Sequence, residues 1–258
     1  MVTIGMNRTV LVTGASSGIG AAIAYAFAEQ GDLLVLVGRS LERLQKAKDD
    51  ILKQYPGAVI KVYELDVRDQ KRAKQVCQTI LEDVKKIDVL INNAGLALGL
   101  EPFQDYDLDD VDTMIDTNIK GILYVTRQIL PSMLERNEGH IINMGSTAGI
   151  YAYAGAAVYS ATKAAVKTLS DGIRIDTIAS DIKVTTVQPG IVETNFSKVR
   201  FHGDEEKAHQ VYEGIEALKP EDIADCILFA TLQPRRVQIS DLTIMANQQA
   251  TGFTIHRN

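Results

Sequence analysis

Three residues have the types and the spacing that proton transfer at an oxygen atom requires. Among the nine tyrosines, Tyr159 alone has a lysine four positions downstream, Lys163, and Ser146 lies upstream of both. Residues four positions apart on a helix share one face, so the phenol and the ammonium would point into the same space. A cation beside a phenol favours the phenolate, and a serine hydroxyl can hold a carbonyl oxygen. We expect these side chains to move a proton on and off an alcohol oxygen.

The same pair also has a simpler interpretation. An isolated Tyr-x-x-x-Lys is most often an amphipathic core tyrosine followed by a solvated lysine. The other motifs of the chain favour the catalytic interpretation, as the following paragraphs show.

A glycine-rich turn lies at the first junction between a predicted strand and a predicted helix. Residues 13–20 read TGASSGIG and follow an apolar run of strand length. Glycines permit a tight turn there, and backbone amides at the start of a helix bind a pyrophosphate. The spacing differs from the common G-x-G-x-x-G, and an ordinary turn is the alternative. The position favours a dinucleotide, for which we expect contacts from Gly14, Ser16, Ser17, Gly18, Ile19 and Gly20.

The residue after the second predicted strand indicates which dinucleotide is bound. A site for NAD normally presents Asp or Glu to the ribose 2′-hydroxyl at this point. Here Gly38 is followed by Arg39 and Ser40. A guanidinium suits a 2′-phosphate, to which it donates forked, charge-assisted hydrogen bonds. We therefore predict NADP rather than NAD, the alternative being that Arg39 is a solvated surface residue.

Further candidate residues lie at the ends of other predicted strands, where open α/β sheets bind their ligands. One pair follows the third strand and is placed to reach an adenine. A run of small residues after the fourth strand allows close approach of the backbone, and the segment after the sixth is expected beside a nicotinamide. The residues predicted from these segments are Asp66, Val67, Asn93, Ala94, Gly95, Pro189, Gly190, Ile191, Val192 and Thr194.

Apolar runs of strand length alternate with segments of helical period along the chain. Several runs are continuously apolar, as in parallel strands that are buried on both faces. Repeated strand–helix–strand order predicts a Rossmann-type α/β fold, a doubly wound parallel sheet with helices on both faces. The seven predicted strands are 9–13, 33–38, 59–65, 88–92, 140–144, 183–188 and 241–245. The predicted helices are 20–30, 40–54, 69–84, 109–135, 157–179 and 220–231.

The rhythm is broken between the sixth predicted strand and the last predicted helix. Residues 195–216 are rich in charge. An insertion at that point would lie at the ligand-binding edge of the sheet, so we expect a substrate lid there. Because no repeat, linker or low-complexity tract divides the chain, residues 1–258 are interpreted as one NADP-binding domain.

Composition excludes several functional classes. The 258 residues are 46% hydrophobic and 23% charged, as in ordinary globular proteins, and a net charge of −6 lacks the basic footprint of nucleic-acid binding. No apolar run is long enough for a transmembrane helix, and residues 1–8 lack the pattern of a secretion signal. Cys77 and Cys226 show no metal-binding spacing. We expect a cytoplasmic protein with no metal, membrane or nucleic-acid partner.

Taken together, the motifs resemble the short-chain dehydrogenase/reductase family over essentially the whole chain. Within that family the chain is similar to NADP-dependent 3-hydroxy acid dehydrogenases that act on serine and allo-threonine. This closer similarity lies in longer stretches, such as NNAGLALGLEP from Asn92 and NFSKVRFHGD from Asn195. The pieces that carry the family resemblance, in family order and spacing, are 13–20, 92–95, Asn118, Ser146, 159–163 and 189–190.

The resemblance implies a role for each catalytic residue. Tyr159 is then the general acid/base, while Lys163 lowers the pKa of that tyrosine and holds the nicotinamide ribose. Ser146 orients the substrate oxygen. Asn118 anchors a water that connects Lys163 to solvent, the alternative being an amide buried inside a long helix. Family members are usually homotetramers whose subunits meet through the helices predicted at 109–135 and 157–179.

The leading hypothesis for the substrate is a small 3-hydroxy acid such as serine, allo-threonine or 3-hydroxypropanoate. A reductase of other carbonyls, such as 3-oxoacyl thioesters, ketones or aldehydes, is the enzymatic alternative, and a catalytically silent NADP sensor is a more distant one. A substrate carboxylate needs donors, and Lys198, Arg200 and His202 lie in the candidate lid. For these three side chains we favour a solvated, charged loop. The backbone amides of residues 97–99 and 145–147 could bind the carboxylate instead.

Overall fold

The computed structural model describes residues 7–258, so most of the N-terminal segment considered above lies outside the described residues. One sheet of seven parallel strands has the order β3-β2-β1-β4-β5-β6-β7. The direction of winding reverses between β1 and β4, which confirms the predicted doubly wound fold. The strands are β1 (Thr9–Thr13), β2 (Leu33–Gly38), β3 (Ile60–Glu64), β4 (Val89–Asn92), β5 (Gly139–Met144), β6 (Ile182–Pro189) and β7 (Asp241–Ile244).

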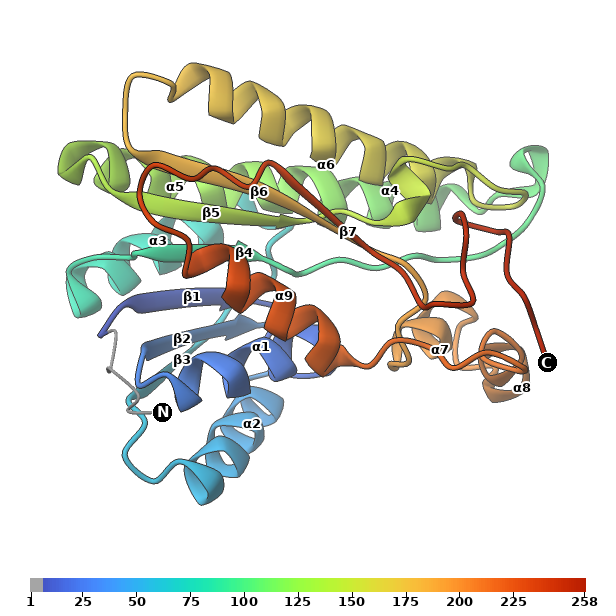
Figure 1. Cartoon of the computed structure of the whole chain (residues 1–258), viewed down its shortest axis with the longest axis horizontal. Coiled ribbons are helices and arrows are strands. Elements are labelled where there is room, and N and C mark those ends of the chain that lie inside the picture. The colour runs from blue at the N-terminus through green and yellow to red at the C-terminus, as the bar shows by residue number, and fades with distance from the viewer. Residues whose placement is uncertain (1–6) are drawn as a thin grey trace.

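Helices cover both faces of this sheet (Figure 1). α1, α2 and α9 pack on one face, and α3, α5 and α6 pack on the other. Among residues 7–258, no helix is both long and apolar enough to cross a membrane. The helices are α1 (Gly18–Glu29), α2 (Leu41–Gln54), α3 (Gln70–Val84), α4 (Leu108–Ile115), α5 (Gly121–Arg136), α6 (Ala157–Asp176), α7 (Phe196–Arg200), α8 (Glu205–Gln210) and α9 (Pro220–Thr231).

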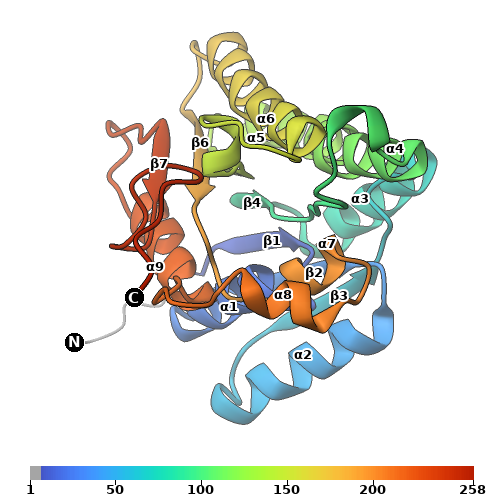
Figure 2. The same cartoon turned by 90° about the vertical axis from the view of Figure 1, so that its right-hand side faces the viewer.

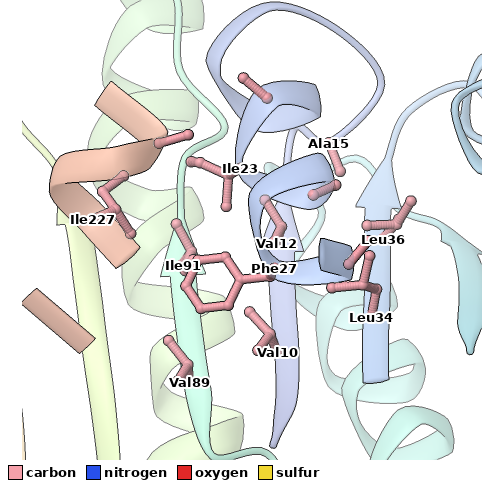
Figure 3. Close-up of a cluster of buried hydrophobic side chains, with 14 of the residues drawn as sticks. Val10, Val12, Ala15, Ile23, Phe27, Leu34, Leu36, Val89, Ile91 and Ile227 are labelled. Atoms are coloured by element: carbon pink, nitrogen blue, oxygen red, sulfur yellow. The ribbon is translucent and has the colours of Figure 1, made fainter. Parts of the chain in front are cut away.

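The continuous apolar runs of the strands supply two hydrophobic cores, one on each face. Successive side chains of a strand point to opposite faces, so Val10 and Val12 of β1 join one core and Leu11 joins the other. In the first core, Phe27 of α1 and Ile227 of α9 pack over the middle of the sheet (Figure 3). Burial on both faces fixes the register of the strands and therefore the positions of the loops at their carboxyl ends.

The long helix predicted at 109–135 is interrupted. α4 and α5 are joined by a π-helical turn, Asp116–Lys120, in which the backbone N–H of Gly121 donates to the carbonyl of Asp116. A side chain on Gly121 would lie 2.7 Å from Cγ2 of Val67, so the glycine lets α5 approach the loop after β3 closely. A π turn inserts one residue into a helix and redirects the side chains around it, and such turns occur frequently at functional sites.

The segment 195–216 leaves the sheet at its carboxyl edge and contains α7 and α8, which stand in front of the strand ends (Figure 2). Its two ends are held together. Val192 and Leu218 form a parallel bridge, the N–H of Glu193 donates to the Leu218 carbonyl at 2.8 Å, and the N–H of Leu218 donates to the Ile191 carbonyl at 3.0 Å. The segment 195–216 therefore forms a loop between β6 and α9 whose two ends are hydrogen-bonded to each other.

Candidate active site

The structure brings Tyr159, Lys163 and Ser146 together at the carboxyl edge of the sheet. Tyr159 and Lys163 occupy one face of α6 and are 8% and 5% exposed, while Ser146 follows the end of β5. The Lys163 ammonium donates a 2.8 Å hydrogen bond to the carbonyl of Met144 and lies 5.9 Å from the centroid of the Tyr159 ring. The hydroxyl of Ser146 accepts from the N–H of Ala148 at 3.1 Å. These contacts hold the three functional groups in one small space.

Burial dominates the protonation of this group. It raises the pKa of the Tyr159 phenol to about 12, although the positive charge of Arg200 and a hydrogen bond with Ser146 act to lower it. Burial likewise lowers the pKa of the Lys163 ammonium to about 8, because the charged form loses its hydration. The net pKa of Tyr159 is therefore raised, because desolvation outweighs the positive charge of Arg200 and the hydrogen bond with Ser146, and the lowering effect expected of Lys163 stays a prediction.

Asn118 sits in the π turn and is fully buried. Its amide pairs with the backbone of Leu96, accepting from the N–H at 2.9 Å and donating to the carbonyl at 2.8 Å, and it also donates to the hydroxyl of Thr162 at 3.1 Å. The side chain is thus a buried amide, as the alternative describes, and it joins the π turn, the loop after β4 and α6. The role of Asn118 in anchoring a water stays a prediction.

Gly95 leaves room for the catalytic lysine. A side-chain carbon at this position would lie 3.3 Å from the Lys163 ammonium and 3.2 Å from the amide oxygen of Asn118. Both contacts are tighter than ordinary van der Waals contacts. The absence of a side chain at Gly95 therefore keeps the space around the Lys163 ammonium open, and close approach of this backbone to a cofactor stays a prediction.

The glycine turn after β1 has the form of an anion site. Ser17 caps α1 in an extended conformation but its hydroxyl accepts no capping hydrogen bond, so no side chain satisfies the first amides of the helix. Gly14 and Gly18 have φ of +67° and +53°, which only glycine adopts freely. A side chain on Gly20 would lie 2.3 Å from the carbonyl oxygen of Gly14. The turn therefore requires its glycines for conformation and for close packing.

Asn93, predicted to contact the cofactor, has its side chain directed into this turn. Its amide donates to the carbonyls of Thr13 at 3.0 Å and Gly14 at 3.3 Å. The Thr13 hydroxyl in return accepts from the N–H groups of Asn93 and Ala94, each at 3.0 Å. This reciprocal pairing locks the turn to the end of β4. The contribution of Asn93 is to shape the turn, and Thr13, which our prediction left out, does the same.

The residues after β2 and β3 lie together. Arg39 is exposed and forms no ion pair with any residue in the described range 7–258. Its positive charge nevertheless helps to lower the pKa of the Asp66 carboxyl group. Although burial opposes it, hydrogen bonds from Arg68 hold the pKa of Asp66 below its usual value. The Ser40 hydroxyl caps α2 by accepting from the N–H of Arg43 at 3.3 Å. The guanidinium of Arg39 therefore remains available to an anion.

The segment after β6 runs from the catalytic group to the glycine turn. The Ser146 hydroxyl lies 3.5 Å from the carbonyl of Pro189 at one end, and a side chain on Gly18 would be 3.4 Å from Thr194 at the other. The segment therefore connects the Ser, Tyr and Lys group to the glycine turn. Gln249 fixes its middle by accepting from the N–H of Ile191 at 3.0 Å, and sequence inspection offered no signal for that contact.

A buried chain of polar side chains supports the site from below. Asn92 donates to Asn143 at 2.8 Å and to Thr126 at 2.9 Å, and Asn143 donates to Ser170 at 2.9 Å. Asn92 and Asn143 are directly paired in the register of β4 and β5. The available signal was an asparagine at or next to the carboxyl end of each of two apolar strands, since buried amides need partners. The network ties the two strands that carry the catalytic loops to α5 and α6.

The first helix of the insertion, α7, packs against Tyr159. The Phe196 ring of α7 lies 5.8 Å from the Tyr159 ring, and the guanidinium of Arg200 lies 5.0 Å from the same ring. Lys198 is instead exposed and paired with Glu205, and His202 lies 2.9 Å from Asp110. The prediction of a solvated, charged loop fits Lys198 and His202. It is wrong for Arg200, whose side chain turns inward because three aromatic rings surround it.

These observations define a class of protein. A doubly wound sheet carries a glycine turn for a dinucleotide and a Ser, Tyr and Lys group at the same edge. The family model described as short chain dehydrogenase matches residues 8–205. The chain belongs to the short-chain dehydrogenase family.

Particular relatives are similar along nearly the whole chain. A Salmonella typhi protein named NADP-dependent 3-hydroxy acid dehydrogenase YdfG is 45% identical over 251 residues, which are 96% of this chain and 99% of the relative. An NADP-dependent 3-hydroxy acid dehydrogenase of Schizosaccharomyces pombe is 41% identical over 252 residues, 97% of each chain. Among solved structures, the closed form of serine dehydrogenase complexed with NADP+ is 43% identical, with a TM-score of 0.89. The match covers 97% of this chain and 100% of the serine dehydrogenase chain.

Proposed function

We propose that this protein is an NADP-dependent oxidoreductase. It transfers a hydride between the nicotinamide and the hydroxyl-bearing or carbonyl carbon of a small 3-hydroxy acid of the serine, allo-threonine or 3-hydroxypropanoate type. The observation that carries the proposal is the meeting of Tyr159, Lys163 and Ser146 at the sheet edge that also holds the glycine turn. The similarity to 3-hydroxy acid dehydrogenases along nearly the whole chain supports the substrate class.

The residues at this edge fit NADP. The uncapped first turn of α1 suits the pyrophosphate, and the unpaired guanidinium of Arg39 suits the 2′-phosphate. Asp66 and Val67 would flank the adenine, Lys163 would hold the nicotinamide ribose, and the segment 189–194 would lie along the nicotinamide and the pyrophosphate. When bound, the cofactor supplies the hydride chemistry, while the protein binds and orients the reactants.

Proton transfer belongs to the residues of the chain. In alcohol oxidation, the phenolate of Tyr159 accepts the proton of the substrate hydroxyl, and the hydroxyl of Ser146 donates a hydrogen bond to the same oxygen. Lys163, held at the carbonyl of Met144, places a positive charge near the phenolate. In the reverse direction the phenol of Tyr159 returns its proton to the carbonyl oxygen as the hydride arrives.

The pKa values give the reaction a pH dependence with a definite sign. Oxidation needs the phenolate, and the pKa of Tyr159 is raised to about 12, so the reactive fraction grows as pH rises toward that value. Lys163 loses its proton near its pKa of about 8, which removes a charge that favours the phenolate. We expect kcat/KM for oxidation to rise up to about pH 8 and less steeply above it, whereas reduction, which needs the neutral phenol, varies little below pH 8. Steady-state rates in both directions test this, and an oxidation rate that falls with pH in that range would contradict it.

Cofactor preference tests the assignment of Arg39. Charge-assisted hydrogen bonds contribute roughly 1.5–3 kcal/mol each, so we expect NADP to be favoured over NAD by about tenfold to a hundredfold in kcat/KM. Arg39→Asp should abolish or reverse that preference, because a carboxylate repels a 2′-phosphate and accepts from a 2′-hydroxyl. Arg72→Asp, an exposed substitution on α3, is the matched control. Equal efficiency of the wild type with both cofactors would contradict the assignment.

A substrate panel tests the proposed function against its alternatives. Purified protein is assayed with NADP and serine, allo-threonine or 3-hydroxypropanoate, and with NADPH and a 3-oxoacyl thioester or a simple ketone. We expect the 3-hydroxy acids to have the highest kcat/KM. Preference for the thioester or the ketone would favour a general carbonyl reductase, and binding of NADPH with no turnover of any substrate would favour a sensor.

We also propose a homotetramer acting in the cytoplasm. Large apolar side chains are exposed on the outer helices, including Leu123 and Leu134 of α5 and Ile175 of α6, which is 69% exposed. Burial of such exposed apolar side chains against another subunit would support this assembly. Light scattering should give four times the mass of one chain. A monomer would contradict the proposed assembly without affecting the active-site assignment.

A further inference from the structure

One cation of the insertion lies inside the candidate active site. The guanidinium of Arg200 lies 5.0 Å from the centroid of the Tyr159 ring, 5.4 Å from that of Phe196 and 5.9 Å from that of Tyr153. Stacking on several rings restricts the orientation of the guanidinium and leaves its forked edge to bind a ligand. The arginine is thus directed at the space beside the catalytic phenol.

The guanidinium has no anionic partner within the described part of the chain, residues 7–258. Its Nε atom is buried and makes no hydrogen bond there. A buried donor without a partner is rare in native structures and calls for an acceptor from elsewhere. Two neighbouring side chains differ in this respect, since Lys198 is paired with Glu205 and His202 lies 2.9 Å from Asp110.

The backbone of Arg200 is tied to the loop that carries other site residues. Its carbonyl accepts from the N–H of Gly99 at 2.9 Å, which joins the end of α7 to the loop after β4. That same loop positions Gly95 and Leu96 beside Lys163 and Asn118. The arginine is therefore placed by the same elements that place the catalytic group.

The position suits a ligand that carries both a reacting hydroxyl and a carboxylate. In a 3-hydroxy acid, the carboxyl carbon lies two bonds from the reacting carbon, about 2.5 Å away. With its hydroxyl at Tyr159 and Ser146, such a molecule would have its carboxylate next to the phenol ring, where the guanidinium lies. A guanidinium donates two parallel hydrogen bonds to a carboxylate, which fixes orientation as well as charge.

We propose that Arg200 binds the substrate carboxylate and so makes the site selective for 3-hydroxy acids over neutral alcohols. The inference rests on the proposed function and assigns one residue of this chain to substrate recognition. The positive charge of Arg200 also acts to lower the pKa of Tyr159, which is consistent with its closeness to the reacting atoms.

The test compares a charged substrate with a neutral one of the same shape. The substrates are 3-hydroxypropanoate and 3-hydroxypropanamide with NADP, and the variants are Arg200→Met, Arg200→Lys and the control Lys198→Met. We expect Arg200→Met to lower kcat/KM for the acid by roughly 10²-fold and to change that for the amide little, because two charge-assisted hydrogen bonds are lost. Arg200→Lys, which keeps the charge without the fork, should fall between. Lys198→Met should behave as the wild type, since Lys198 faces Glu205.

The binding of NADPH, measured through the fluorescence of the cofactor, shows whether each variant keeps a folded cofactor site. An Arg200→Met variant that binds NADPH and keeps the wild-type ratio of kcat/KM for the acid to kcat/KM for the amide would overturn the role of Arg200. The proposed function would stay in place. A wild type that oxidises the amide as efficiently as the acid would overturn the 3-hydroxy acid assignment itself. Loss of activity with both substrates in Arg200→Met, together with a normal acid-to-amide ratio in Arg200→Lys, would also overturn the proposal.

Discussion

Replacing Tyr159 by phenylalanine will lower kcat by roughly 10²–10⁴-fold, the usual contribution of a general acid/base. The ring keeps its packing against Phe196, so the fold and the cofactor site should survive. Only the oxygen that exchanges a proton with the substrate is removed. The measurement is kcat with 3-hydroxypropanoate and NADP, together with the Kd for NADPH, which we expect to stay within a few-fold of the wild type.

A matched control separates chemistry from packing in this experiment. Tyr63→Phe removes a phenol on β3 whose O–H donates a hydrogen bond to Asp83 at the surface and which makes no contact with Tyr159, Lys163 or Ser146. This variant should have wild-type turnover. Near-normal kcat in Tyr159→Phe would show that another group transfers the proton, and it would remove the basis of the mechanism.

Replacing Lys163 by methionine will lower kcat/KM by roughly 10²–10³-fold, as loss of one preorganised electrostatic group typically does. Methionine fills the buried space without a charge, so the hydrogen bond to the Met144 carbonyl and the cation beside the phenol are both lost. The lysine is also proposed to hold the nicotinamide ribose. NADPH binding should therefore weaken in this variant, unlike in Tyr159→Phe.

The neighbouring lysine provides the control. Lys167 lies one turn further along α6 and pairs with Asp171 at 2.9 Å near the surface. Lys167→Met should leave kcat/KM and NADPH binding unchanged. If Lys163→Met bound NADPH normally and turned over normally, the division of roles between Tyr159 and Lys163 would be wrong.

Much of the fold could be predicted because its signals are local. Continuous apolar runs such as β1 are typical of a parallel sheet covered on both faces, and the glycine turn marks the first strand–helix junction. The pairing of Tyr159 with Lys163 followed from helical spacing alone. Hydrophobic periodicity and residue spacing are set by the sequence, and both are retained in the folded structure.

What could not be predicted depends on tertiary contacts. The π turn at Asn118 arises where α5 approaches Val67, and the amide then finds the backbone of Leu96, a partner from a distant strand end. Whether the pKa of Tyr159 is raised or lowered depends on how completely the phenol is buried, and sequence spacing does not show that burial.

The inward turn of Arg200 is another tertiary effect. In sequence it is one of three candidate donors, with Lys198 and His202, in a charged loop. Only the structure shows that Glu205 and Asp110 engage its two neighbours while aromatic rings surround Arg200 itself. Charge runs are poor guides to function for this reason, since the partner of each charge lies elsewhere in the chain.

The most direct test of the central claim follows the hydride. 3-Hydroxypropanoate carrying two deuterium atoms on its C3 carbon is incubated with NADP and the enzyme, and the reduced cofactor is analysed by mass spectrometry. We expect one deuterium in each molecule of reduced cofactor, with a slower rate than for the unlabelled acid if hydride transfer limits turnover. Wild-type protein that binds NADPH but forms no labelled cofactor from this acid, serine or allo-threonine would contradict the claim that it oxidises 3-hydroxy acids.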